Sequence, residues 1–596
     1  DAAGPSRNSI IAANTIEDNS LFGIIGHLKD STIGGPSQAN DGNTIARSGY
    51  GILLVANSSG NTVARNTIRD NVAGAGAALS LSGGVSGKNT LIENDFSGNG
   101  MGIALNNASD NTVESNQVAG SRLQGIYIGS QSTGNTLKNN RVTESTLEGI
   151  YISGPRNTFD GNIVSGGLAI GIRLTDGAPG NELLRNRVTL NQKTGMELDS
   201  ADGNWVHDNP DISGNKEHGI ALGQFGVNNV LERNIITGNT KLGIWVEGAG
   251  NTVLGSRIAD NREAGIALAT TAQQNRLEGN LLESTGSANG APYQPIGLSL
   301  LGSANQVEKN VIRSHRLGVI LGAEAPGNVL HFNDIVGNSE GGITKVGGEP
   351  VDAIYNWYGD ASGPGGLGAG KGDAVAGAVN YSPFLTKIYG DVLAAQNGYL
   401  GFDIGLLKGW QGLVTPVRLK DSTWGQITRR GALLSNSLAL NYDIAYRFNS
   451  ATQGWEQMLD ADPVVPLQGY MVLMKDSDRV VLWVNEGPTN PPSRTLEEGW
   501  ALTGPAEAPW LQPRPAGEML ATAWLMGLRV VSPPLGGQPA WVFTVSNPDP
   551  NRTDPSQTAP FAHGRVLWVY APARLTITGT TTTPISNLSL PRYLLP

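Results

Sequence analysis

The segment Asn135–Ile152, NTLKNNRVTESTLEGIYI, decides the fold of this chain, because its pattern recurs from the N-terminus to about residue 358. Asn135 and Asn140 each stand two residues before an apolar side chain, and Gly149 then opens the apolar alternation Ile150–Ile152. Self-similarity at a nearly fixed period of this length predicts a solenoid in which each repeat forms one turn.

Three columns of the repeat keep their register along the chain. The first Asn recurs at Asn43, Asn61, Asn89, Asn111, Asn135, Asn157, Asn181, Asn204, Asn229, Asn251, Asn275, Asn305 and Asn328. The second Asn recurs at Asn14, Asn66, Asn94, Asn116, Asn140, Asn162, Asn186, Asn209, Asn234, Asn280, Asn310 and Asn333. The glycine recurs at Gly102, Gly125, Gly149, Gly171, Gly195, Gly219, Gly243, Gly265, Gly297, Gly318 and Gly342.

Each repeat contains three short runs of alternating apolar residues, rich in Ile, Val and Thr and separated by Asn and Gly, which is the pattern of β-strands. No run has helical spacing, so leucine-rich and helical repeats are excluded. Three strands per turn of about 22 residues predict an all-β fold, a right-handed parallel β-helix. Because equivalent residues would lie about 4.8 Å apart in neighbouring turns, the Asn side chains are expected to form amide ladders at the corners.

The overall composition excludes several classes of function. The chain has 596 residues and a net charge of −10 without a basic run, which argues against nucleic-acid binding. It contains no Cys, so disulfides and thiol chemistry are excluded. No stretch is long and apolar enough to span a membrane. No signal peptide opens the sequence, and a start at Asp1, so close to the first repeat, indicates a processed or truncated chain.

The first turn, Ser9–Asn19, has almost no sequence ahead of it to cover its backbone. Because an open strand edge recruits other strands, we expect this turn either to meet another subunit or to be capped by residues upstream of Asp1. A head-to-tail contact of this kind makes rings or filaments, so the sequence predicts self-association into an oligomer or filament.

The repeats end in VDAIYNWYGDASGPGG, residues 351–366, where Asn356 keeps the second-Asn position, and Val379–Phe384 follows a Gly-rich loop. This ending and the repeats resemble secreted bacterial parallel β-helix repeat proteins. Those proteins often close the helix with an asparagine-tryptophan-aromatic-glycine segment and a tyrosine-serine-proline-aromatic stop. The resemblance covers about two thirds of the chain and implies the fold, whereas members serve as lyases, epimerases, adhesins and surface-layer proteins.

Beyond about residue 390 the Asn pattern stops and Trp and Pro become frequent. The dipeptide Gly409-Trp410 matches Gly499-Trp500, and alternating apolar runs predict two antiparallel β-sandwich modules. Paired modules of this kind resemble C-terminal appendages of bacterial surface proteins. The predicted domains are a β-helix at 1–389, sandwich modules at 390–490 and 491–580, and an extended tail at 581–596.

The residue that follows Gly-Ile in each repeat is expected to point outward. Along successive turns this column reads Ala104, Tyr127, Tyr151, Arg173, Glu197, Ala221, Trp245, Ala267 and Ser299. Sugar rings stack on exposed aromatic rings, while Arg and Glu bind hydroxyls or uronates. The candidate binding residues are therefore Tyr127, Tyr151, Arg173, Glu197 and Trp245. The alternative is a plain surface stabilised by cross-strand pairs.

Charged residues form two further patterns. A column that alternates in sign predicts an ion-pair ladder and consists of Lys193, Glu217, Lys241 and Glu263. No cofactor is predicted, although calcium is a possible ligand of an acidic group at Asp176, Glu197, Asp199 and Asp202. The same carboxylates could serve glycoside hydrolysis, with His207 and His218 as nearby bases. The alternative is a solvated acidic face.

The motifs of catalytic β-helices are missing from the chain. It lacks the Asp-Pro-His triplet of mannuronan epimerases, the Asn-Thr-Asp and Asp-Asp pairs of polygalacturonases and a clear match to the calcium strand of pectate lyases. We therefore predict an extracellular or cell-surface structural protein, a filament, sheath or surface-layer component, with glycan binding as an additional role. The alternatives are a lyase or epimerase acting on an acidic polysaccharide, and a carbohydrate-binding adhesin.

Overall fold

The computed structural model describes residues 4–35, 41–79, 86–175, 178–288, 291–389, 400–415, 417–420, 422–428, 442–484, 492–504, 529–532, 541–543 and 566–578. The chain divides into two compact units. The first comprises Asp1–Val329 and Thr344–Val351, and the second comprises Leu330–Ile343 and Asp352–Leu590. Among the described residues, no helix has the length and apolar character needed to cross a membrane.

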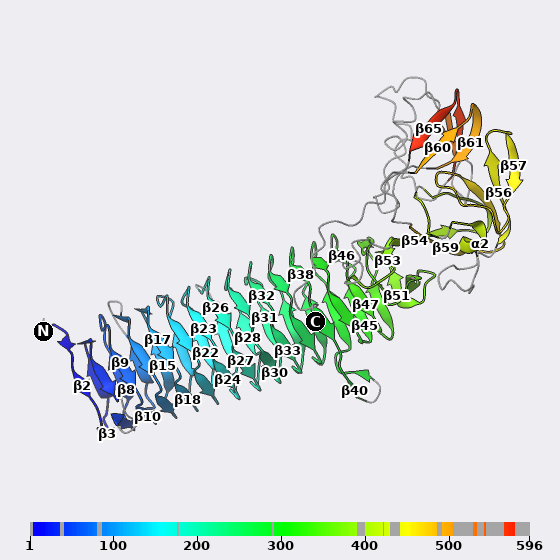
Figure 1. Cartoon of the computed structure of the whole chain (residues 1–596). Helices are drawn as coiled ribbons and strands as arrows, with labels where there is room; N and C mark the ends of the chain where they lie inside the picture. Colours follow the sequence, from blue (N-terminus) through cyan, green and yellow to red (C-terminus); the bar gives the residue numbers. More distant parts are fainter. Residues whose placement is uncertain are drawn as a thin grey trace. The chain divides into compact units, whose positions relative to one another are not determined.

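The repeats form the predicted parallel β-helix (Figure 1). One turn consists of three short strands, β20 (Thr136–Lys138), β21 (Arg141–Thr143) and β22 (Ile150–Ile152). Each strand pairs in parallel with the equivalent strand of the next turn, and Figure 1 shows the strands stacked in order along the helix. The all-β fold with almost no helix is therefore confirmed.

Stacking of the turns produces three parallel sheets of 16, 14 and 16 strands. We name each sheet after the part of the repeat that its strands follow: the first Asn, the second Asn or the Gly-Ile step. The first-Asn sheet runs from β2 (Ile10–Ile11) to β52 (Val379–Asn380). The second-Asn sheet runs from β3 (Thr15–Glu17) to β47 (Asp334–Val336). The Gly-Ile sheet begins at β4 (Phe22–Gly26), reaches β48 (Gly341–Lys345) and ends with β51 (Gly372–Gly377) and β50 (Pro364–Gly366).

The core of the helix consists of the inward-pointing residues of these strands. In the representative turn, Leu137, Val142, Ile150 and Ile152 are fully buried. Burying each such side chain contributes about 1.5–3 kcal/mol relative to leaving it in water. Because side chains alternate across a strand, Tyr151 between the two buried Ile residues points outward.

The predicted Asn ladder is confirmed at Asn140, which is fully buried. Its Oδ1 accepts hydrogen bonds from the backbone N and the Nδ2 of Asn116, both at 3.0 Å. Its Nδ2 donates to the backbone oxygen of Val113 at 2.8 Å and to Oδ1 of Asn162 at 3.0 Å. The side chain of Asn140 therefore joins three turns. Its backbone N–H also donates a hydrogen bond to the side-chain oxygen of the Asn in the next turn.

The assignment of Asn43 to the first-Asn column is wrong. Asn43 accepts hydrogen bonds from Asn14 and donates hydrogen bonds to Asn66, so it lies in the second-Asn column. The first-Asn position of that turn belongs to Ser31, whose backbone N donates to Asn61. A serine hydroxyl accepts and donates like the amide it replaces, and Ser9 at the start of the column bonds Ser31 in the same way.

A third ladder, which the sequence pattern did not predict, runs along the corner that precedes the Gly-Ile sheet. Its hydrogen-bonded members are Asn19, Ser48, Asn71 and Asn99, and later Asn191, Asn215, Asn239, Asn261 and Gln294. The turns between these two runs carry Ser121, Ser145 and Gly167 at the same position. Mixed residue types hide this column in the sequence.

The closing segment continues the second-Asn ladder as predicted. Asn356 accepts from Asn333 and donates to the backbone oxygen of Leu330. Trp357 forms an isolated parallel β-bridge with Asp334. The carboxylate of Asp334 accepts a hydrogen bond from the backbone N of Tyr389 at 2.7 Å. The end of the repeats is thereby tied to the first residues that follow them.

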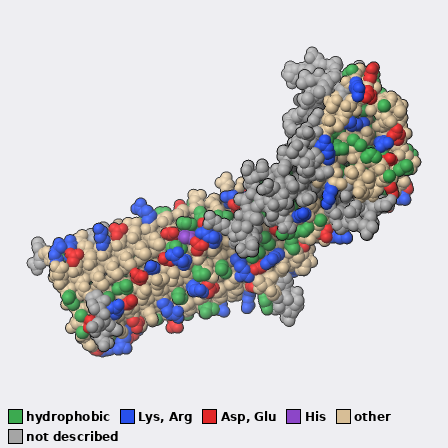
Figure 2. Space-filling view, viewed as in Figure 1, with side chains coloured by type: hydrophobic (Ala, Val, Ile, Leu, Met, Phe, Trp, Pro, Cys, Tyr) green, Lys and Arg blue, Asp and Glu red, His purple; other side chains and the backbone are tan. Residues whose placement is uncertain are grey.

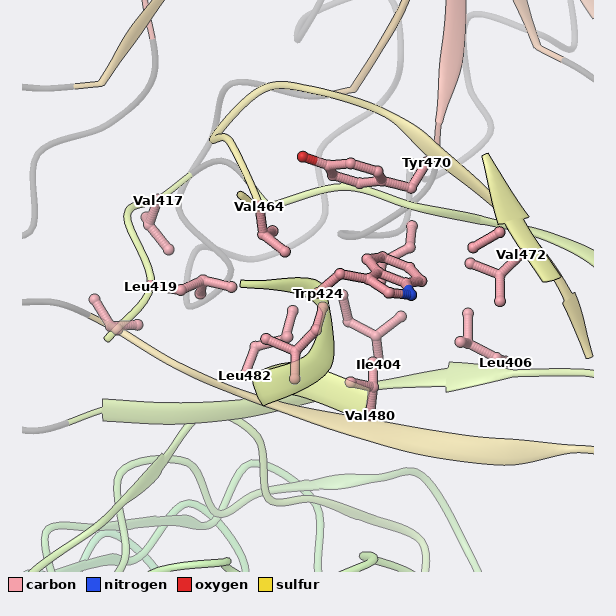
Figure 3. Packing of buried hydrophobic residues seen from close by; sticks show 14 of the residues in the cluster. Ile404, Leu406, Val417, Leu419, Trp424, Val464, Tyr470, Val472, Val480 and Leu482 are labelled. Carbon is pink, nitrogen blue, oxygen red and sulfur yellow. The ribbon is translucent and has the colours of Figure 1, made fainter. Parts of the chain in front are cut away.

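A core around Trp424 follows the repeats in the second unit (Figure 3). Trp424 begins the short helix α2 (Trp424–Thr428), is fully buried, and donates from Nε1 to the hydroxyl of Tyr442 at 3.1 Å. Leu482 and Ile404 lie around it (Figure 3). They come from an antiparallel sheet of β53 (Phe384–Leu385), β54 (Leu400–Leu406) and β59 (Asp478–Trp483).

Two four-stranded antiparallel sheets of the same strand order confirm the predicted internal resemblance. The first has the order β55 (Gly409–Leu413), β58 (Tyr470–Met474), β56 (Tyr442–Asn449) and β57 (Gly454–Gln457). The second has the order β61 (Gly499–Thr503), β64 (Leu567–Ala571), β62 (Arg529–Ser532) and β63 (Trp541–Phe543). A separate pair consists of β60 (Ser493–Leu496) and β65 (Leu575–Thr578).

The Gly-Trp pairs at residues 409–410 and 499–500 open β55 and β61, and both glycines have positive φ. Only glycine adopts such a backbone at little cost. The exact domain boundaries stay a prediction, and the predicted tail at 581–596 lies outside the described residues.

Candidate functional site

The outward column of the Gly-Ile sheet has the predicted register. Its members pair in parallel from turn to turn, in the order Ala104, Tyr127, Tyr151, Arg173, Glu197, Ala221, Trp245, Ala267 and Ser299. They lie on β15 (Met101–Leu105), β19 (Ile126–Ile128), β22, β25 (Ile172–Leu174), β28 (Met196–Leu198), β31 (Ile220–Leu222), β34 (Leu242–Val246), β37 (Ala264–Leu268) and β42 (Ile296–Leu300). We call Tyr127, Tyr151, Arg173, Glu197 and Trp245 the strip.

Aromatic rings occupy both ends of the strip. The rings of Tyr127 and Tyr151 stack with centroids 5.5 Å apart and planes 8° apart. Trp245 stacks on His218 with centroids 6.3 Å apart and planes 16° apart. All three strip aromatics are half-buried, so part of each remains open to solvent. Such rings are apolar surfaces held in fixed orientation by their neighbours.

A charged cluster around Arg173 lies between these aromatic ends. The guanidinium contacts carboxylates of Glu197 and Asp199, both at 3.1 Å, and of Glu148 at 3.6 Å. The Nε of Arg173 is buried and makes no hydrogen bond within the described residues, because its contact with Glu197 lacks hydrogen-bond geometry. A single cation is thus shared by three anions.

Burial and charge act in opposite directions on this cluster. Burial works to lower the pKa of Arg173, but the attraction of Glu197, Asp199 and Glu148 outweighs it and the pKa is raised. Burial raises the pKa of Glu197; repulsion by neighbouring carboxylates adds to this, while Arg173 opposes it. Glu197 therefore keeps its proton to a higher pH than an exposed Glu does.

His218 lies beside the strip in the column that precedes the glycine. Burial lowers its pKa to about 4, and the positive charge of Lys241 adds to this while Glu217 opposes it. Its Nδ1 is buried without a hydrogen-bond partner among the described residues. At neutral pH the imidazole is uncharged and provides an aromatic surface next to Trp245.

An NMR titration of the intact protein is expected to give His218 a pKa of about 4 instead of its ordinary 6.5. Since the unfolded chain then binds the proton more readily, the contribution of His218 to stability is complete above about pH 6.5 and is lost as the pH falls toward 4. A measured value close to 6.5 would show that the ring is hydrated and does not rest on Trp245.

The other predicted histidine does not belong to this site. His207 lies on β29 (Trp205–His207) in the first-Asn sheet, where its ring contacts Glu182 at 3.1 Å and Asp208 at 2.8 Å. It stacks on Trp205 and is buried. The interpretation of His207 as a base near the acidic group is therefore wrong, because the two lie on different sheets.

The predicted acidic group is only partly assembled. Glu197 and Asp199 contact Arg173, whereas Asp202 contacts the backbone N of Val227 and Asp176 lies outside the described residues. Within the described ranges, no three His, Cys, Asp or Glu side chains are placed to hold a metal ion. Calcium binding stays a prediction.

The charge ladder beside the strip has the predicted register. Backbone hydrogen bonds connect Lys193, Glu217, Lys241 and Glu263 in consecutive turns. The ammonium of Lys241 lies 3.2 Å from the carboxylate of Glu217. On the face shown in Figure 2, Lys and Arg side chains likewise lie among Asp and Glu side chains along the β-helix.

An apolar patch continues the strip toward the N-terminus, and sequence reasoning missed it. It consists of Phe22, Leu53, Val55, Ala75, Met101, Ala104 and Tyr127. Phe22 stacks on Tyr50 with centroids 5.3 Å apart. Phe22, Tyr50, Met101, Glu148 and His218 share the position before the glycine, so the repeat register alone could have revealed this second outward column.

The comparisons with known proteins agree with this fold. Residues 2–118 and 201–356 match the family model described as a right-handed β-helix region. Residues 78–194 match the model of the periplasmic copper-binding protein NosD. The family match therefore agrees with the parallel β-helix that these residues form in the structure. No curated protein matches it.

Several solved structures are similar to this chain at low identity. A double mutant of the periplasmic alginate epimerase AlgG is 14% identical, with 56% of this chain and 78% of that chain covered and a TM-score of 0.39. The A-module of a mannuronan C-5 epimerase from Azotobacter vinelandii is 16% identical, with 64% and 92% covered and a TM-score of 0.33. A tailspike protein of an E. coli bacteriophage, in complex with pentasaccharide, is 10% identical, with 79% and 82% covered and a TM-score of 0.41.

The stretch that matches the copper-binding family does not supply the usual ligands of a copper ion. Copper in proteins is held by His, Cys and Met side chains. The stretch 78–194 that matches the copper-binding family contains no His and no Cys, and Met101 is its only Met. We therefore assign no copper chemistry to this site.

Proposed function

We propose that this right-handed β-helix repeat protein binds a polysaccharide along the strip, in the periplasm or outside the cell. The observation that carries the proposal is the continuous outward column in which the Tyr127–Tyr151 stack leads through Arg173 and Glu197 to Trp245. The match to a periplasmic family supports the location.

The chemistry of the strip suits a chain of sugar rings. The apolar faces of pyranose rings stack on flat aromatic side chains, and their hydroxyls bind carboxylates, guanidinium groups and phenols. A stacked column repeats the same kind of contact at every turn. A linear polymer that follows the helix axis would therefore meet aromatic, polar and aromatic surface in succession.

The charge of the strip favours a glycan rich in hydroxyls over an acidic one. A uronate needs a cation that is free to bind it, and Arg173 is already shared by Glu148, Glu197 and Asp199. These three carboxylates would repel further negative charge. An acidic polysaccharide, which the sequence suggested for the enzyme alternative, is thus less well matched than a neutral one.

A glycan-processing enzyme is the second candidate, and one observation favours it. The raised pKa of Glu197 makes it a possible proton donor, and Asp199 offers a second carboxylate on the same guanidinium. Glycoside hydrolysis uses two carboxyl groups whose environments separate their proton affinities. Glu197 would be the general acid in that mechanism.

A structural role in a filament, sheath or surface layer stays a third proposal, together with anchoring as an adhesin. It rests on the regular, solenoidal architecture, whose end turns expose unpaired strand edges unless something covers them. Self-association would appear as a mass above that of the single chain in light scattering of the native protein.

Replacing Trp245 with Ala is expected to weaken retention of the protein on a neutral polysaccharide by about tenfold, because a ring that stacks on the sugar is lost. We would measure mobility in native gels that contain dextran, xylan, polymannuronate or polygalacturonate. Trp205→Ala is the matched control, since Trp205 is likewise open to solvent but lies on a different sheet.

The same panel separates the three proposals. Retention without chemical change supports a binder, whereas new reducing ends or the absorbance of unsaturated uronates would identify an enzyme, which Glu197→Gln should inactivate. Equal mobility of the wild type and Trp245→Ala in every gel would contradict glycan binding at the strip and leave the structural role.

A further inference from the structure

The sheet β55-β58-β56-β57 has an aromatic pocket on the face opposite the Trp424 core. Strand pairing places Trp410 opposite Leu473 and Tyr446 opposite both Met471 and Gln457. Trp410, Tyr446, Trp455 and Met471 line a cavity of about 490 Å³. This volume lies in the range of pockets that hold small ligands.

The walls of the pocket are large rings exposed to solvent. Trp410 and Trp455 are 43% and 49% exposed, whereas Trp424 on the other side of the sheet is fully buried. The ring of Tyr446 lies between them, 6.3 Å from Trp410 and 6.4 Å from Trp455. Exposed aromatic side chains gathered in one concave place mark a binding surface.

The rings on one side of the pocket are held firmly in place. Trp455 packs edge-on against Phe448 at 5.4 Å and against Trp568 at 5.6 Å. Phe448 is buried and contacts Trp568 at 4.8 Å. Because this support exists before any ligand arrives, binding costs little ordering of the walls.

Comparison of the two sheets explains why a cavity exists here. Met471 pairs with Gly412 and Tyr446 in the first sheet, and Trp568 pairs with Leu502 and Val531 in the second. The two strand positions are therefore equivalent. The smaller and more flexible Met471 leaves room where the second sheet carries a tryptophan.

The polar atoms of the walls define the chemistry of the ligand. Neither indole N–H, of Trp410 or of Trp455, nor the hydroxyl of Tyr446 has a hydrogen-bond partner among the described residues, so they are available to a ligand. Among the residues of this unit that the structure describes, no charged side chain lines the pocket.

We propose that this pocket binds a neutral sugar, as a single ring or the end of an oligosaccharide. Flat apolar walls match the faces of a pyranose, and the free N–H and O–H groups match its hydroxyl oxygens. A charged ligand would find no counter-ion among the described lining residues. The pocket and the strip share no residues, so this proposal does not depend on polysaccharide binding by the β-helix.

Isothermal titration of the full chain with maltose, cellobiose and N,N′-diacetylchitobiose tests this assignment. We expect at least one disaccharide to bind, and Trp410→Ala to raise its Kd by about tenfold, since one wall is removed. Met471→Trp should abolish binding by filling the cavity while the three aromatic walls stay in place. Leu459→Ala, at a 63% exposed position in the same unit, should leave Kd unchanged.

Near-UV circular dichroism would check that each variant is folded. The two pocket variants change the cavity in opposite ways, because Trp410→Ala enlarges it and Met471→Trp fills it. The assignment is overturned if none of the three disaccharides binds the wild type, or if Trp410→Ala and Met471→Trp both bind with the wild-type Kd. Preferential binding of a proline-rich peptide, which also suits aromatic grooves, would overturn it as well.

Discussion

An Asn140→Ala variant is expected to lose about 3 kcal/mol or more of stability, because four hydrogen bonds disappear from a dry interior. The amide of Asn140 accepts two bonds from Asn116 and donates one each to Val113 and Asn162. Its removal leaves the backbone N–H of Asn116 buried without a partner. Each unsatisfied group of this kind costs about 1–3 kcal/mol.

The loss would be measured as a lower urea midpoint and as faster amide exchange confined to the turns around Asn140. The matched control is Lys138→Ala, two residues away, where the side chain is exposed. If both variants keep the wild-type midpoint, the ladder does not stabilise the stack.

A Gly149→Val variant is expected to destabilise its turn by about 3 kcal/mol or more, the upper end of the effects of overpacking. A Cβ at this position would lie 2.3 Å from Cγ1 of Val164 and 2.7 Å from the backbone oxygen of Gly171. The side chain of Val164 could rotate, but the backbone of the next turn is fixed by its own hydrogen bonds. The glycine column therefore allows neighbouring turns to approach.

Gly120→Asn is the control for this variant. Gly120 has positive φ and open space at the Cβ position, and Asn tolerates that backbone conformation. The soluble yield and the midpoint temperature of thermal unfolding should fall sharply for Gly149→Val. Both should stay near the wild-type values for Gly120→Asn. Equal behaviour of the two variants would refute close contact at the glycine column.

The repeat period was sufficient to predict the fold, because the β-helix converts each sequence column directly into a column in space. The ladder partners of Asn140 follow from that rule alone. The errors arose where residue identity changes while the role does not. Ser31 replaces Asn at one corner, so Asn43 was placed in the wrong column.

The strip could also be predicted, since alternation fixes which residue after Gly-Ile points outward. The neighbouring column stands directly before the glycine in the same register, but its residue types vary from turn to turn, so no repeated residue marks it. For that reason Glu148 and His218 were not connected with Arg173 and Trp245.

The aromatic pocket of the second unit lay beyond sequence reasoning. Its walls come from strands far apart in the chain, and only the pairing of β55, β58 and β56 brings Trp410, Met471 and Tyr446 together. Antiparallel sheets of this kind carry no fixed period that would show which strands are neighbours. The repeated Gly-Trp dipeptide indicated two similar modules but gave no strand order.

Hydroxyl-radical footprinting of the wild-type chain, with and without the polysaccharide that retains it most strongly, tests glycan binding most directly. The proposal predicts that bound polysaccharide protects Tyr127, Tyr151 and Trp245 from oxidation, while exposed Trp205 on another sheet is oxidised equally in both samples. Equal oxidation of the three strip residues with and without bound polysaccharide would contradict the account.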